Sequence, residues 1–154
     1  MRLALALLFA ALPLAALPLR AQEVVFLVRH AEKADSSKDA ALSAAGEARA
    51  RALAGKLREA GVTAIYTSEF RRTKETAAPL ARALGIAPRE HAAGDSAGLV
   101  ALLRKEKRVL VVGHSNTLPE VAAGLGVKEK IEIADDRFDD LLVVVPPMVV
   151  RLKQ

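Results

Sequence analysis

Two short runs of bulky apolar residues restrict the fold of this 154-residue chain more than any other feature. Residues 24–28 have the sequence Val-Val-Phe-Leu-Val, and residues 109–112 have the sequence Val-Leu-Val-Val. Continuous runs of this kind are typical of strands that are buried on both faces of a parallel sheet. The first run ends at Arg29-His30 and the second at Gly113-His114. Because ligands bind beyond the carboxyl ends of the strands in open α/β sheets, both histidines are expected at a ligand site.

The remaining pattern predicts alternating strands and helices in one domain over residues 22–154. Helices are expected at 43–59, 70–84, 97–105 and 117–125, and strands at 24–29, 63–67, 109–113 and 141–145. Pro146-Pro147 ends the last of these strands, and residues 148–152 are expected to add an edge strand. The alternation predicts an α/β fold, a three-layer sandwich with a mostly parallel central sheet and helices on both faces.

The helix expected at 70–84 carries two cations near its start. Ser68 is a candidate N-cap, and Arg71 and Arg72 fall in the first turn. Cations oppose the helix dipole at this end, so an anion is expected to share the space. Only one of the two side chains is expected to point inward, and Arg71 is the one assigned to the surface.

Three segments carry a resemblance to a known family. They are Arg29-His30-Ala31-Glu32, Ser68-x-x-x-Arg72-x-x-x-Thr76 and Gly113-His114-Ser115-Asn116. In this order, each after an apolar run, they resemble the motifs of the histidine phosphatase superfamily, which has the phosphoglycerate-mutase-like fold. The chain is similar to the smallest members of that family. Its members often have glycine after each histidine, whereas Ala31 and Ser115 stand there in this chain.

The resemblance implies a phosphohydrolase that removes phosphate from phosphomonoesters. His30 would attack phosphorus and become a phosphohistidine, which water then hydrolyses. Arg29, Arg72 and His114 would surround the oxygens of the transferring phosphoryl group. Phosphoryl transfer depends mainly on positioning and charge stabilisation, which suits such a set. Neither a cofactor nor a metal is expected.

Other residues near these motifs are expected to contact the substrate. Ser115 and Asn116 follow the second histidine, and Lys33 and Ser36 belong to the loop over residues 31–41. This loop follows the nucleophile and could cover the pocket, and the alternative is a solvated loop. Glu32 is expected to order the loop.

The general acid for the leaving oxygen is expected between the arginine helix and the second histidine. Glu90 and Asp95 are the candidates. Asp95 has an alternative structural role as the N-cap of the helix at 97–105, and Glu90 could equally be a solvated loop carboxylate. His91 is expected to be an exposed loop residue.

Two other functions remain open at this point. One is a phosphate- or anion-binding module without turnover, and the other is a metal-dependent hydrolase that uses the histidines as ligands. The histidines do not have metal-ligand spacing and the chain has no cysteine, so metal-free chemistry is the simpler hypothesis.

The composition restricts the classes of molecule that the protein is expected to bind. Without residues 1–21 the formal net charge falls from +5 to +3, a mild excess that is compatible with anionic substrates and does not bear on nucleic acid. Aromatic residues make up only 3% and offer little surface on which bases could stack, so the expected partner is a small phosphorylated substrate or a phosphorylated surface molecule and not a nucleic acid. The oligomeric state is not indicated by the sequence.

Residues 1–21 resemble a secretory signal peptide. A basic start at Arg2 precedes an apolar segment over 3–19, and Ala21 is the expected cleavage site. Pro13 and Pro18 argue against a stable membrane span. The domain is therefore expected to be exported, periplasmic or secreted, with an uncleaved membrane tether as the alternative.

Overall fold

The structure, a computed structural model, describes residues 24–154, and the expected signal peptide at 1–21 lies outside them. A six-stranded sheet with the order β3-β2-β4-β1-β5-β6 forms its centre. The strands are β1 (Val24–Arg29), β2 (Ala64–Ser68), β3 (Arg89–His91), β4 (Arg108–Gly113), β5 (Asp140–Val145) and β6 (Met148–Lys153). The helices are α1 (Ala44–Leu57), α2 (Arg71–Leu84), α3 (Ser96–Leu103) and α4 (Thr117–Gly124).

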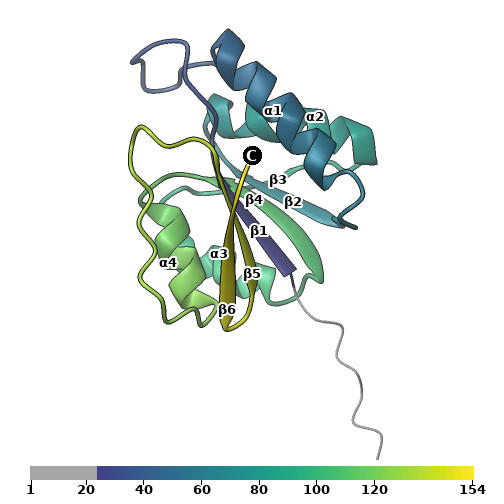
Figure 1. The fold of residues 1–154 in the computed structure, drawn as a ribbon, viewed down its shortest axis with the longest axis vertical. Coiled ribbons are helices and arrows are strands. Elements are labelled where there is room, and N and C mark those ends of the chain that lie inside the picture. The colour runs from purple at the N-terminus through teal and green to yellow at the C-terminus, as the bar shows by residue number, and fades with distance from the viewer. Residues whose placement is uncertain (1–23) are drawn as a thin grey trace, which may run out of the picture.

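Helices cover both faces of the sheet (Figure 1), as expected from the alternating pattern. Successive residues of a strand point to opposite faces, so neighbours in β1 enter different cores. Phe26 packs in the cluster that contains Leu53 of α1, whereas Leu27 packs in the cluster that contains Leu103 of α3. The pairs β1–β4, β2–β4 and β2–β3 are parallel, and β5 and β6 are added antiparallel. The predicted three-layer α/β sandwich with a mostly parallel sheet is confirmed.

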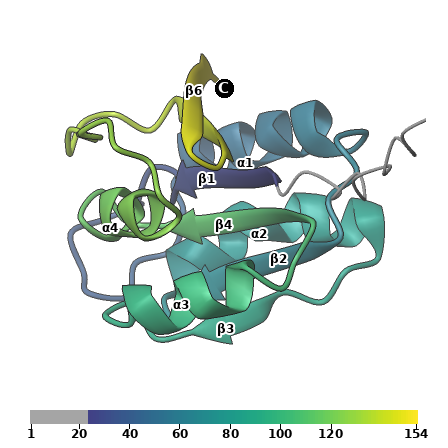
Figure 2. The ribbon, with the colours of Figure 1, turned by 90° about the horizontal axis from the view of Figure 1, so that it is seen from below.

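The short strand β3 was not expected from the sequence. It lies beside β2 at one edge of the sheet, and Figure 2 shows β1, β4, β2 and β3 in their order. Its three residues are polar and two of them, Arg89 and Glu90, are exposed, so no apolar run indicates the strand. The expectation that His91 is an exposed loop residue was wrong, because this half-buried residue ends β3, paired with Ser68.

Ser68 is not the N-cap of α2, contrary to the expectation. It is the fully buried last residue of β2, and α2 begins two residues after Glu69 with Phe70 at the cap position. Phe70 makes no side-chain cap hydrogen bond. The Asp39 carboxylate instead accepts from the backbone N–H of Arg71, at 2.7 Å. The start of this helix is thus satisfied in part from a distant loop, and the Ser68 hydroxyl, which accepts from the backbone N–H of Phe70 at 3.4 Å, also has other partners.

Strand pairing brings the two histidines to the same edge of the sheet. Arg29 of β1 lies opposite Gly113 of β4, and the backbone N–H of His30 donates to the Gly113 carbonyl at 2.9 Å. The next N–H, that of Ala31, donates to Thr76 Oγ1 of α2 at 2.9 Å. The loop that leaves β1 is therefore fixed both to the neighbouring strand and to α2.

Within residues 24–154, no helix combines the length and the apolar character that a membrane span needs.

The start of α1 packs directly on the backbone of the loop that follows β1. Glu32 O accepts a hydrogen bond from Ser43 N at 2.9 Å, and Ser43 Oγ accepts from Gly46 N at 3.1 Å. A Cβ atom at Gly46 would overlap the Glu32 carbonyl oxygen, whereas a Cβ at Gly55 of the same helix would meet nothing within 4 Å. The absence of a side chain at Gly46 thus allows α1 to support the loop after the first histidine.

Gly46→Ala is expected to lower the free energy of unfolding by about 1–3 kcal/mol, because the added methyl forces two backbones apart. Gly55→Ala is the matched control and should raise it by about 0.5–1 kcal/mol, since alanine favours the helix. Urea denaturation followed by circular dichroism measures both changes. Equal effects of the two substitutions would contradict the close packing of α1 on Glu32.

Candidate active site

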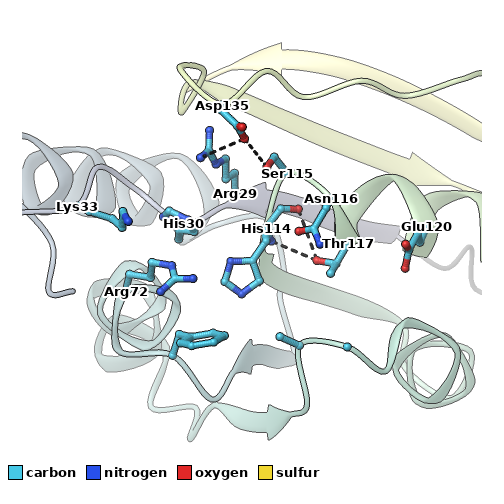
Figure 3. A pocket seen from close by; sticks show the side chains of 13 residues that line it. Arg29, His30, Lys33, Arg72, His114, Ser115, Asn116, Thr117, Glu120 and Asp135 are labelled. Atoms are coloured by element: carbon cyan, nitrogen blue, oxygen red, sulfur yellow. Dashed lines mark hydrogen bonds and ion pairs between the residues drawn. The ribbon is translucent and has the colours of Figure 1, made fainter. Parts of the chain in front are cut away.

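The two histidine rings lie beside each other at the carboxyl ends of β1 and β4. The ring centroids of His30 and His114 are 5.4 Å apart, and the rings meet edge to face. Only 5% of His30 and 9% of His114 is exposed. Figure 3 shows both rings at the centre of a pocket with Arg29 and Arg72 close by. The structure thus brings together the four residues that the sequence predicted as the core of the site.

A backbone contact fixes the tautomer of His30. Its Nδ1 lies 2.8 Å from the carbonyl oxygen of Ala31. A carbonyl oxygen only accepts, so Nδ1 must carry the hydrogen and donate it. The lone pair of the neutral ring is then on Nε2. Nε2 is therefore the atom of His30 that can attack an electrophile.

Two hydroxyl groups orient His114. Its Nε2 lies 3.0 Å from Ser68 Oγ, and Ser68 Oγ lies 3.0 Å from Thr73 Oγ1. Thr73 has one hydroxyl hydrogen, which it donates to the Phe70 carbonyl at 2.8 Å. Ser68 must then donate to Thr73 and accept from Nε2–H of His114. This chain of hydrogen bonds fixes the ring of His114 and leaves Nδ1 outside it.

Arg29 is held by the segment that precedes β5. Its Nη1 donates to the carbonyl of Ala134 at 3.0 Å, and its Nη2 lies 3.8 Å from Asp135 Oδ1. The guanidinium carbon stands 4.3 Å from the ring centroid of Phe138. One edge and one face of the guanidinium are thus occupied by the protein.

Arg72 is held in the same manner by other parts of the chain. Its Nη1 donates to the Lys38 carbonyl at 2.8 Å, and its guanidinium carbon lies 4.3 Å from the ring centroid of Phe70. Each arginine therefore has one backbone carbonyl and one aromatic ring that fix its position.

Both arginines keep a donor that the protein does not use. The Nε atoms of Arg29 and Arg72 are buried and have no hydrogen-bond partner among the residues that the structure describes. Buried donors are nearly always paired in folded proteins, so these two indicate a ligand with acceptor oxygens. A phosphate group suits two guanidinium groups, because charge-assisted hydrogen bonds to it are strong.

Both histidines are neutral at pH 7. Burial, with the positive charge of Arg72 adding to it, lowers the pKa of His30 to about 4, although the hydrogen bond to Ala31 acts in the opposite direction. Burial and the charge of Arg72 likewise lower the pKa of His114 to about 4. The positive charge in the pocket thus comes from the arginines, and the nucleophilic lone pair of His30 is available.

The cavity around these groups has a volume of about 590 Å³. Among the predicted substrate contacts, Lys33, Ser115 and Asn116 line it, whereas Ser36 does not. Ser115 Oγ donates to Asp135 Oδ1 at 2.8 Å, and this contact joins the loop after the second histidine to the segment that holds Arg29.

The two predicted general acids lie outside the pocket. Glu90 forms an ion pair with Lys74 at 2.6 Å on the outer edge of the sheet, because the unexpected strand β3 carries it there. Asp95 accepts from Gly98 N at 2.8 Å and caps α3, the alternative role noted from the sequence. Neither residue lines the cavity, so the structure does not bring these two candidates to the reacting groups.

Two carboxylates that were not predicted do line the cavity: Asp135 and Glu120. No motif marks Asp135, which reaches the pocket through the irregular segment between α4 and β5. Glu120 had a signal, because it lies four residues after Asn116 and residues at this spacing share one face of a helix.

Two further expectations were confirmed. Arg71 points away from the pocket and pairs with Glu75, whose Oε1 lies 2.6 Å from Arg71 Nε. Glu32 orders its loop, because both of its carboxylate oxygens accept from Arg49 Nε at 3.0 Å.

In the part of the chain that the structure describes, no group of three or more potential metal ligands lies together.

Comparison with known proteins agrees with this geometry. Residues 25–93 match the model of the histidine phosphatase superfamily (branch 1). Over 69 residues the chain is 39% identical to the probable phosphoglycerate mutase GpmB of Yersinia enterocolitica. That match covers 40% of this chain and 32% of the relative, so the chain matches about a third of the relative's length.

Solved structures share the fold at low sequence identity. The mycobacterial glucosyl-3-phosphoglycerate phosphatase Rv2419c in complex with inorganic phosphate superposes with a TM-score of 0.65 at 17% identity, over 79% of this chain and 88% of that chain. The Agrobacterium tumefaciens protein assigned as the phosphohistidine phosphatase SixA superposes with a TM-score of 0.63 at 23% identity, over 84% and 96% of the two chains.

The match to the family model covers residues 25–93, less than half of the chain. The matched residues include Arg29, His30 and Arg72, whereas His114 lies beyond them. The fold supplies the fourth group, because strand pairing brings His114 beside His30.

The low pKa values of the two buried histidines predict a measurable titration. Proton NMR of the ligand-free protein should show two imidazoles that titrate near pH 4 instead of near 6.5, and His30→Ala should remove one of them. The folded protein binds fewer protons than the unfolded chain between about pH 6.5 and 4, so the free energy of unfolding should fall as the pH falls through this window. Midpoints near 6.5 would contradict the buried, cationic surroundings.

Proposed function

We propose that the protein is a phosphatase that removes phosphate from phosphomonoesters through a phosphohistidine intermediate on His30. One observation carries the proposal: the unprotonated Nε2 of His30 shares a pocket with two arginines, each of which has a buried and unpaired Nε–H donor. A nucleophile and fixed cations in one pocket are what phosphoryl transfer requires.

The phosphoryl group would lie between His30, His114 and the two arginines. Nε2 of His30 attacks phosphorus while the bond from phosphorus to the leaving oxygen breaks, and the leaving oxygen takes up a proton from the solvent that reaches the cavity. Water then attacks phosphorus, the P–N bond breaks, and phosphate leaves with His30 neutral again. Arg29 and Arg72 stabilise the charge on the phosphoryl oxygens in both steps.

Access of water favours a phosphatase over a mutase, although the superfamily relatives include both kinds. A mutase must keep its phosphohistidine from water until the phosphoryl group is transferred again. In this pocket Lys33, Asn116, Glu120 and Asp135 are exposed lining residues, so solvent reaches the cavity. Export, which is proposed from residues 1–21, would direct the activity to phosphorylated molecules outside the cytoplasm.

The experiment that tests the proposal compares the wild-type domain with His30→Ala on an aryl phosphate, with and without EDTA. The wild-type rate should survive the chelator, and the variant should lose on the order of 10³ or more in kcat because the nucleophile is gone. Rapid quenching followed by mass spectrometry should show one added PO₃ group on His30.

The other outcomes identify the alternative functions. Activity that EDTA abolishes would indicate a metal-dependent hydrolase, and tight phosphate binding without turnover would indicate a binding module. A wild-type rate in His30→Ala would exclude the phosphohistidine route.

Arg72→Ala and Arg71→Ala form a matched pair that tests the role of the arginine helix. Arg72→Ala should lower kcat by about 10²–10³, because it removes a fixed donor from the charged phosphoryl oxygens. Arg71→Ala removes the same charge one residue away, and its exposed pair with Glu75 contributes little, so kcat should change less than about threefold. Steady-state kinetics on the same aryl phosphate measure both. Similar losses in the two variants would contradict the assignment of Arg72 to the phosphoryl group.

A further inference from the structure

Charge is distributed unevenly along the pocket. Arg29, Lys33 and Arg72 lie around His30, whereas Glu120 lies on the far side of His114 and Asn116 (Figure 3). Asp135, the other lining carboxylate, is already paired with Arg29 and Ser115. The side of the pocket remote from the nucleophile therefore carries a carboxylate that the arginines do not neutralise.

Glu120 is fixed by a contact between two helices. It lies one turn into α4, and its Oε2 accepts from Ser96 Oγ, at the start of α3, at 2.7 Å. In the described part of the chain no donor is recorded at its other oxygen, Oε1. The carboxylate is thus held in place and keeps an acceptor for a ligand.

Glu120 also lies where the catalytic pocket adjoins a second cavity. Gly94 and Glu120 line both spaces. The second cavity has a volume of about 520 Å³ and runs along Ala97, Val100 and Gly124, between α3 and α4. A substrate that extends from the phosphoryl site toward this cavity would lie beside the Glu120 carboxylate, which lines both spaces.

We infer that Glu120 is a specificity-determining residue that selects leaving groups with an ammonium or hydroxyl group at a set distance from the phosphate. The inference rests on the proposed phosphatase function. Glu120 lies four positions after Asn116, a rise of about 6 Å along the helix, so the donor must stand several bonds from phosphorus. The preferred substrate is then a phosphomonoester whose alcohol carries a positive charge or a hydrogen-bond donor, with any remaining part directed into the second cavity.

A series of ω-aminoalkyl phosphates with two to five methylene groups tests this, against n-alkyl phosphates of matched length. For each length, kcat/KM of the amino compound is divided by kcat/KM of the alkyl compound. This ratio should reach about threefold to fivefold at one length and no more, because ion pairs that are exposed to solvent are weak. Glu120→Gln should bring that ratio close to one, because the KM of the amino compounds rises while that of the alkyl compounds stays the same. Glu129→Gln removes the same charge from an exposed loop outside both cavities and should keep the wild-type ratio.

Three results would overturn the inference: a wild-type ratio near one at every length, a ratio that Glu120→Gln leaves unchanged, or a Glu120→Gln loss that is equal for amino and alkyl compounds. The last result would make Glu120 a group that acts on every leaving group. Calorimetric dissociation constants of the same compounds, measured on His30→Ala, which lacks the nucleophile, give the corresponding ratio for binding without turnover. A protein that hydrolyses neither these compounds nor the aryl phosphate would refute the proposed phosphatase function, while the binding ratio would still decide the role of Glu120.

Discussion

The parallel pairing of β1 with β4, with Arg29 opposite Gly113, is the constraint on which the site depends. Side chains alternate between the faces of a strand, so a slip of one residue would move each buried residue of β1 into the opposite core. Both cores are filled with large side chains, and Phe26 and Leu27 could not exchange faces without loss of packing. The register that buries β1 correctly is therefore also the register that places His30 beside His114.

The arginines depend on more distant parts of the chain. Arg29 is held by a segment more than a hundred residues later, and Arg72 by the loop that follows β1. In each case a backbone carbonyl and a phenylalanine ring fix the guanidinium and leave the Nε donor free. The cations are thus positioned before a ligand arrives, which is the arrangement that lowers the cost of ordering them in the transition state.

Apolar runs and helix periodicity are local signals, and they were sufficient for the main elements. The prediction that His30, Arg29, Arg72 and His114 form one site rested in addition on the motifs that resemble a known family, and the structure brings these four residues together. The sequence was insufficient where contacts between distant segments determine the structure. The polar strand β3 has no apolar run, and its formation carries Glu90 out of reach of the pocket. The role of Ser68 depends on a histidine 46 positions away, and Asp135 reaches the site through an irregular segment. No local pattern encodes such contacts.

The hydrogen bond from His30 Nδ1 to the Ala31 carbonyl has a consequence for the proposed phosphohistidine intermediate. When Nε2 carries the phosphoryl group and Nδ1 keeps its hydrogen, the ring is a cation. The Ala31 oxygen then faces a full positive charge, and a hydrogen bond to a charged donor is stronger than one to a neutral donor. This one carbonyl therefore stabilises the phosphorylated ring and keeps the hydrogen on Nδ1, so that the imidazole departs from phosphorus as a neutral ring.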